Sequence, residues 1–102
     1  MAYNLIIKEE ADADALEAFL YYQDRQNGLG ERFLQSIQDI YTKLETNPQF
    51  YSILKTDKKK IFRDIKVSDF PFVIIFEIID NDVIVYAVHS TYKKQPAKFR
   101  SK

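Results

Sequence analysis

Residues 72–79 read FVIIFEII, and this stretch decides the fold. All but one of its residues are apolar and most are β-branched or aromatic, which predicts a strand buried on both faces. Asp80-Asn81-Asp82 follows with side chains that favour turns, and residues 83–88 (VIVYAV) predict a strand that returns antiparallel. On the other side, Ser68-Asp69 separates the stretch from residues 61–67 (IFRDIKV), a more polar strand. The remaining residues must therefore cover a three-stranded meander.

Two helices are predicted ahead of this meander. The first runs from about Glu10 to Gln26, and the second from about Leu29 to Glu45. Apolar residues recur at helical spacing in both, as Ala13, Leu16, Phe19, Leu20 and Tyr22 and as Leu29, Phe33, Ile37, Ile40 and Leu44. Gly28 breaks the chain between the helices, and a short strand is predicted over residues 3–8. The order is βααβββ, an α+β fold in which a helical hairpin packs on one face of a small, mainly antiparallel sheet.

Length and composition bound the class of protein. A chain of 102 residues makes one domain, which we place over residues 1–102. It has no cysteine, one histidine and two glycines, so we expect neither a metal site nor a cofactor held by a glycine-rich loop. No signal pattern opens the chain, and no apolar stretch approaches the ~20 residues that span a bilayer. We therefore expect a cytoplasmic protein that does not enter a membrane.

The two halves of the chain differ in charge, although the net charge is zero. Residues 1–50 carry four Lys or Arg against nine Asp or Glu, and residues 51–102 carry eleven against six. The basic half can bind an anionic partner, and we assign the nucleic-acid contacts to Lys60, Lys93, Lys94 and Arg100. The alternative is that these charges are merely solvated, because a globally neutral protein is a poor generic binder of nucleic acid.

Strand parity predicts which polar side chains share a face of the sheet. If residues 68–70 and 80–82 form three-residue loops, the odd-numbered residues lie on one face, which then carries Arg63, Glu77 and His89. The even-numbered residues, rich in Phe and Ile, would form the floor for the helices. A loop of another length would flip this relationship.

The polar strand residues each have a structural and a functional interpretation. Arg63 needs an anionic partner, which is either a nearby carboxylate (Asp64 or Glu77) or a bound phosphate. Glu77 is either that counter-ion or a general base, and His89 is either structural or an acid/base group. Cleavage of RNA through the 2′-hydroxyl needs a base, an acid and a cation, so the candidate catalytic set is Arg63, Glu77, His89 and Tyr92.

Several short motifs in this order resemble the RelE/ParE toxins of bacterial type II toxin–antitoxin pairs, a superfamily that includes plasmid stabilisation proteins. They are Ala11-x-x-Asp14, Tyr21-Tyr22, Gly28-Leu29-Gly30-Glu31-Arg32-Phe33, Asn47-Pro48, Arg63-Asp64-Ile65, Phe70-Pro71-Phe72-Val73-Ile74, and Val85-Tyr86-Ala87-Val88-His89 with Pro96 beyond. The resemblance covers nearly the whole chain and implies the same βααβββ order.

The resemblance also implies a function. It makes the chain a toxin that a separate antitoxin neutralises; RelE-like members cut messenger RNA in the ribosomal A site, and ParE-like members poison DNA gyrase without being nucleases. Arg63 matches the family's arginine, and His89 and Tyr92 fall where nuclease members carry catalytic residues. The preferred prediction is a metal-independent, ribosome-dependent mRNA endonuclease. The alternatives are a non-enzymatic gyrase inhibitor and a degenerate toxin fold kept as a binding module, so the sequence leaves open whether the chain is an enzyme.

Overall fold

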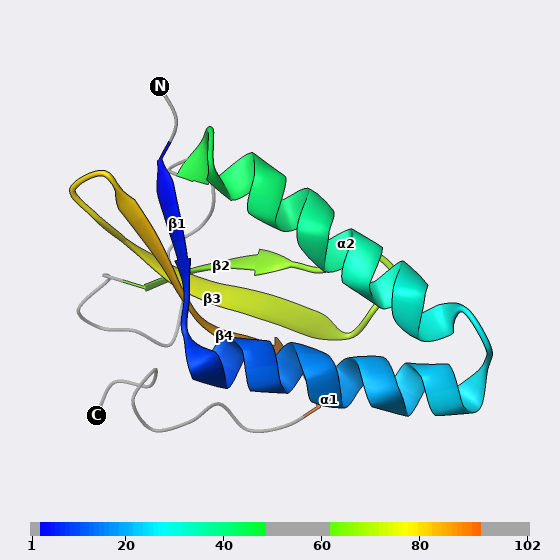
Figure 1. The fold of residues 1–102 in the computed structure, drawn as a ribbon. Coiled ribbons are helices and arrows are strands. Elements are labelled where there is room, and N and C mark those ends of the chain that lie inside the picture. Colours follow the sequence, from blue (N-terminus) through cyan, green and yellow to red (C-terminus); the bar gives the residue numbers. More distant parts are fainter. Residues whose placement is uncertain (1–2, 49–61, 93–102) are drawn as a thin grey trace.

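A computed structural model describes residues 3–48 and 62–92 of the chain. The elements follow the order β1 (Asn4–Ile7), α1 (Glu9–Arg25), α2 (Leu29–Leu44), β2 (Phe62–Lys66), β3 (Phe72–Ile79) and β4 (Asp82–Ser90). The two helices form a hairpin that covers one face of the sheet (Figure 1). The predicted βααβββ order is confirmed, and both helices begin and end within one residue of the predicted positions.

The four strands form one mixed sheet in the order β1-β4-β3-β2. The meander β2-β3-β4 is antiparallel, and β1 joins it parallel to β4. β1 is only four residues long and pairs with β4 from Asp82 to Val85. The chain then turns directly into α1, which runs beside the second half of β4 (Figure 1). This arrangement brings α1 next to the end of β4.

The predicted pairing of β2 with β3 is wrong by one residue. Lys66 pairs with Val73, and the backbone N–H of Val67 donates to the Phe72 carbonyl at 2.9 Å, so the loop holds residues 68–71 instead of 68–70. Pro71 explains the difference, because proline has no N–H and cannot pair with Val67. The shift moves every side chain of β2 to the face opposite to the one predicted.

The β3–β4 pairing changes register half-way along. Asp82 pairs with Ile79, so this turn holds two residues instead of the predicted three. A β-bulge then inserts Tyr86 opposite the Ile75/Phe76 step, and beyond it His89 pairs with Val73, as predicted. The bulge therefore restores the predicted pairing only for the half of β4 that carries His89. β4 ends at Ser90, so His89 lies one residue before the end of the strand.

Each face of the sheet packs a different group of side chains. The face that meets the helices carries Ile65, Phe72, Ile74, Phe76, Ile78, Val83, Val85 and Val88. The outer face carries Phe62, Val73, Ile75, Tyr86 and Ala87. Phe62 and Tyr86 were predicted on the helix side, and Ile65, Val83 and Val85 on the outer side; both predictions are wrong because of the register changes above.

The two helices use their apolar residues differently. The predicted stripe of α2 is confirmed, with Phe33, Ile37, Ile40 and Leu44 buried. α1 instead turns small residues toward the core, namely Ala11, Ala15 and Ala18 together with Tyr22. Leu16 and Leu20, which were predicted to pack on the sheet, are each 57% exposed.

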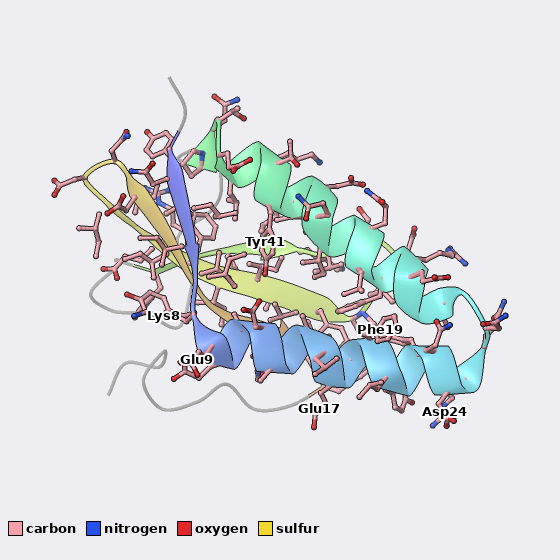
Figure 2. The ribbon with its side chains drawn as sticks, in the orientation of Figure 1. Lys8, Glu9, Glu17, Phe19, Asp24 and Tyr41 are labelled. Carbon is pink, nitrogen blue, oxygen red and sulfur yellow. The ribbon has the colours of Figure 1, made fainter. Side chains whose placement is uncertain are left out.

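Gly30 explains why the two helices approach so closely at their hairpin. A Cβ atom at this position would lie 2.6 Å from the carbonyl oxygen of Phe19 and 2.8 Å from its ring. Figure 2 shows Phe19 on the side of α1 near α2. The Gly30 N–H also donates to the side-chain oxygen of Gln23 at 3.0 Å, which satisfies one of the free N–H groups in the first turn of α2.

Candidate functional site

A partly open groove of about 610 Å³ lies between α1 and the end of β4. Its wall on α1 is made by Asp14, Glu17, Ala18, Tyr21 and Tyr22, and the opposite wall by Pro71, Phe72, Val88, His89, Ser90 and Tyr92. The groove exists because β1 is short. Strand β1 borders only the first half of β4, and α1 borders the second half. It combines two carboxylates, three phenols and an imidazole.

One carboxylate at the groove ties its two walls together. An oxygen of Asp14 accepts a hydrogen bond from the backbone N–H of Val88 at 3.1 Å. Val88 lies beyond the part of β4 that pairs with β1, so the side chain of Asp14 takes the place of a strand partner. Burial raises the pKa of Tyr41 to about 12, and the negative charges of Asp12 and Asp14 contribute to this increase.

Aromatic rings form the floor and one rim of the groove. The ring of Tyr22 packs against Phe70 at 4.9 Å and Phe33 at 5.5 Å between centroids, so it belongs to the core as well as to the groove. Burial, with smaller contributions from Tyr21 and Tyr92, raises the pKa of Tyr22. Tyr21 meets Tyr22 edge-on at 5.2 Å and is itself 53% exposed. The groove is therefore closely packed at its base and open at its rim.

The predicted catalytic residues are distributed over three places. His89 and Tyr92 line the groove. Glu77 lies on the outer face of β3, and Arg63 pairs with Phe76, whose side chain faces the helices. Neighbours directly opposite in a ladder share a face, so Arg63 lies on the opposite face from Glu77 and His89. The predicted shared face for these three residues is wrong.

Glu77 is engaged with a neighbouring strand. Its carboxylate accepts a 2.7 Å hydrogen bond from the hydroxyl of Tyr86, which the bulge turns to the outer face. Burial, together with this hydrogen bond and the charge of Glu77, raises the pKa of Tyr86 to about 12. The ring of Tyr86 in turn packs edge-on against Phe62 at 5.5 Å. The predicted nucleic-acid contacts at Lys60, Lys93, Lys94 and Arg100 all lie outside the described residues.

Sequence reasoning missed the α1 side of the groove. Glu17 and Tyr21 lie one turn apart on a helix face whose charges predict a solvated surface, and Asp14 was noted only as part of a motif. The parallel pairing of β1 with β4 brings them to β4, and no local pattern in the sequence reports that pairing. Over residues 3–48 and 62–92, no group of three or more His, Cys, Asp or Glu side chains is placed to hold a metal ion. None of the helices in these ranges is long and apolar enough to cross a membrane.

Comparisons with known proteins agree with this fold. The family model described as "ParE toxin of type II toxin-antitoxin system, parDE" matches residues 5–93. A solved structure described as "Chromosomal ParDE TA system from P. aeruginosa" superposes with a TM-score of 0.72 at 14% sequence identity, covering 87% of this chain and 96% of that one. A search of curated proteins found no significant match. Because the family model spans most of the sequence, the chain belongs to the ParE toxin family of type II toxin–antitoxin systems, whose members are paired with an antitoxin.

Proposed function

We propose that this toxin acts in the cytoplasm by binding a protein target, DNA gyrase, and does not cut RNA. The observation that carries the proposal is the separation of Arg63 from Glu77 and His89 by the sheet itself. A base, an acid and a cation must all reach the same phosphate in cleavage through the 2′-hydroxyl. Side chains on opposite faces of one sheet do not meet that requirement.

The family assignment supports the same proposal. The matching model is that of the ParE toxins, and the resemblance to ParE-like members implies action on gyrase without nuclease activity. In this proposal His89 and Glu77 are structural. Lys60, Lys93, Lys94 and Arg100 are then candidate contacts to gyrase or to the DNA that gyrase holds, because all four are cationic.

The test follows DNA and protein synthesis separately after expression of the toxin alone in growing bacteria. We expect thymidine incorporation to fall before amino-acid incorporation. In a purified system, the toxin should inhibit supercoiling by gyrase, and His89→Ala should inhibit equally well. Removal of the residues after Tyr92 should abolish toxicity if the basic tail contacts the target. An early loss of amino-acid incorporation with DNA synthesis spared would contradict the proposal.

The second candidate is an RNA endonuclease, and one observation favours it. His89 and Tyr92 line the same groove, so an acid/base group and a ring that could stack on a base lie close together. This candidate predicts that His89→Ala removes toxicity and that messenger RNA is cleaved on ribosomes. Arg63→Ala does not separate the two candidates, because Arg63 lies on the opposite face of the sheet from His89 and cannot act on a phosphate in the groove.

A further inference from the structure

The outward side of α1 carries large apolar side chains that the fold does not use. Leu16 and Leu20 are each 57% exposed and Tyr21 is 53% exposed. Leu16 and Leu20 lie one helical turn apart, and Tyr21 continues the surface into the groove. We call these three residues the α1 stripe. A single exposed leucine needs no explanation, but a cluster beside a groove marks an interaction surface.

The charge on α1 around the α1 stripe is mostly negative. α1 holds six acidic residues against one basic residue, Arg25. Glu17 lies between the two leucines in sequence, lines the groove and points away from the body of the protein (Figure 2). Among the residues that the structure describes, none that lines the groove is a lysine or an arginine. Such a surface repels the phosphates of DNA or RNA and attracts a cationic segment of a protein.

The groove also offers rings that suit a cation. Within the chain itself, the guanidinium carbon of Arg25 lies 4.6 Å from the centre of the Tyr21 ring. Tyr22 and Tyr92 contribute two more phenols to the same groove, and Tyr92 is 85% exposed. A group of tyrosines next to carboxylates binds guanidinium or ammonium groups through both cation–π and Coulomb attraction.

We propose that the α1 stripe and the groove beside it bind a segment of the antitoxin that combines apolar residues with at least one arginine or lysine. The apolar residues cover Leu16 and Leu20, and the cation enters the groove between Glu17 and the tyrosines. The proposal rests on the toxin–antitoxin pairing and adds the chemistry of the segment and the place where it binds. We assign this surface to the antitoxin because the antitoxin is the protein partner that membership of this family implies.

The probes are short overlapping peptides from the antitoxin. We take the antitoxin to be the product of the adjacent small open reading frame. Each labelled peptide is titrated with the full toxin at low and high salt. We expect the peptide that binds to contain arginine or lysine among apolar residues and to bind more weakly at high salt. Glu17→Lys should weaken binding about tenfold, because it turns an attraction into a repulsion. Glu31→Lys, at an exposed position in the first turn of α2, is the matched control and should leave binding unchanged.

A charge swap makes the test reciprocal. A peptide whose arginine or lysine is replaced by glutamate should bind Glu17→Lys more tightly than the unsubstituted toxin. Unchanged binding by Glu17→Lys, or a peptide that binds without any cationic residue, would overturn the proposal. A concentration-dependent dimer that Glu17→Lys dissociates would assign the surface to a second copy. Removal of residues 93–102 could instead increase the affinity for the peptide, even for a peptide without a cationic residue. That result would assign the surface to the toxin's own tail.

Failure of this proposal is distinguishable from failure of the toxin assignment. If the adjacent protein neutralises toxicity and binds irrespective of residue 17, only the proposed location and chemistry of the contact are wrong. If expression is harmless and the adjacent protein does not bind at all, the toxin–antitoxin pairing itself fails.

Discussion

The side chain of Asp14 in α1 accepts a hydrogen bond from the backbone N–H of Val88 in β4, at 3.1 Å. This contact joins residues 74 positions apart in the sequence and fixes the helix against the sheet at the groove. It exists because β1 stops pairing with β4 at Val85, which leaves the next part of that edge to α1. Asp14 therefore has a structural role at the groove that does not depend on a ligand.

Replacement of Asp14 by alanine should lower the free energy of unfolding by about 1–2 kcal/mol, because the half-buried N–H of Val88 loses its partner. Urea denaturation followed by circular dichroism measures the change. Glu17→Ala, on an exposed position one turn further along α1, is the control and should change the stability by less than about 0.5 kcal/mol. Equal effects of the two substitutions would show that the hydrogen bond does not stabilise the fold.

The protein should lose stability in alkali through two tyrosines. The pKa of Tyr41 and that of Tyr86 are both raised from 10.0 to about 12, mainly by burial. The folded state therefore holds these protons more tightly than the unfolded state does. Their contribution to stability is complete below pH 10.0 and is lost as the pH rises toward about 12.

Phenylalanine at these two positions provides the check. Tyr41 lies on the side of α2 that faces the rest of the protein, and it is 8% exposed (Figure 2). The double variant Tyr41→Phe, Tyr86→Phe should show a shallower decline of the urea midpoint over this alkaline range than the unsubstituted protein. Tyr86→Phe also removes the hydrogen bond to Glu77. The free energy of unfolding of this single variant should therefore be lower by about 1–2 kcal/mol at neutral pH. An unchanged alkaline decline would mean that neither phenol is protected by the fold.

The elements of the fold were predictable because their signals are local. The spacing of Phe33, Ile37, Ile40 and Leu44 and the apolar run of β3 each lie within one element, and the structure confirms both. The inner side of α1 was mispredicted because Ala11, Ala15 and Ala18 recur at helical spacing as well as the leucines do. The leucines were predicted to be core residues because they are large. Close packing of α1 on the sheet places the smaller alanines in the core instead.

The site was less predictable than the fold because it depends on register. One proline at residue 71 and one bulged residue at Tyr86 each shift the pairing by a single position. Each such shift moves side chains from one face to the other. The shift at Pro71 is the reason why Arg63 does not share the face of His89, because the bulge leaves His89 in its predicted pairing with Val73. The inclusion of His89 and Tyr92 in one groove could be anticipated from their closeness in the chain, but the wall contributed by α1 could not.

Gly30→Ala should destabilise the helical hairpin by about 1–3 kcal/mol. A methyl group there meets the carbonyl oxygen of Phe19 at 2.6 Å, and a backbone atom cannot move aside without shifting a helix. Thermal unfolding measures the loss. Gln38→Ala, at an exposed position of the same helix, serves as the control because alanine favours helices and nothing is crowded there. Wild-type stability in Gly30→Ala would show that the helices can separate slightly without a loss of stability.

The turn between β3 and β4 should respond to the choice of residue at position 80. Asp80 has a φ of 54°, in the left-handed region, and is one of only two residues, besides one glycine, with positive φ in the described ranges. Alanine bears the full steric penalty of that conformation, so Asp80→Ala should destabilise the protein by about 1 kcal/mol. Glycine reaches the same φ without a clash, so Asp80→Gly should be neutral or slightly stabilising. Because residue 80 is exposed and distant from the groove, antitoxin binding and toxicity should be unchanged in both variants at temperatures where they stay folded. A destabilised Asp80→Gly together with a stable Asp80→Ala would mean that the aspartate side chain, and not the backbone conformation, holds the turn.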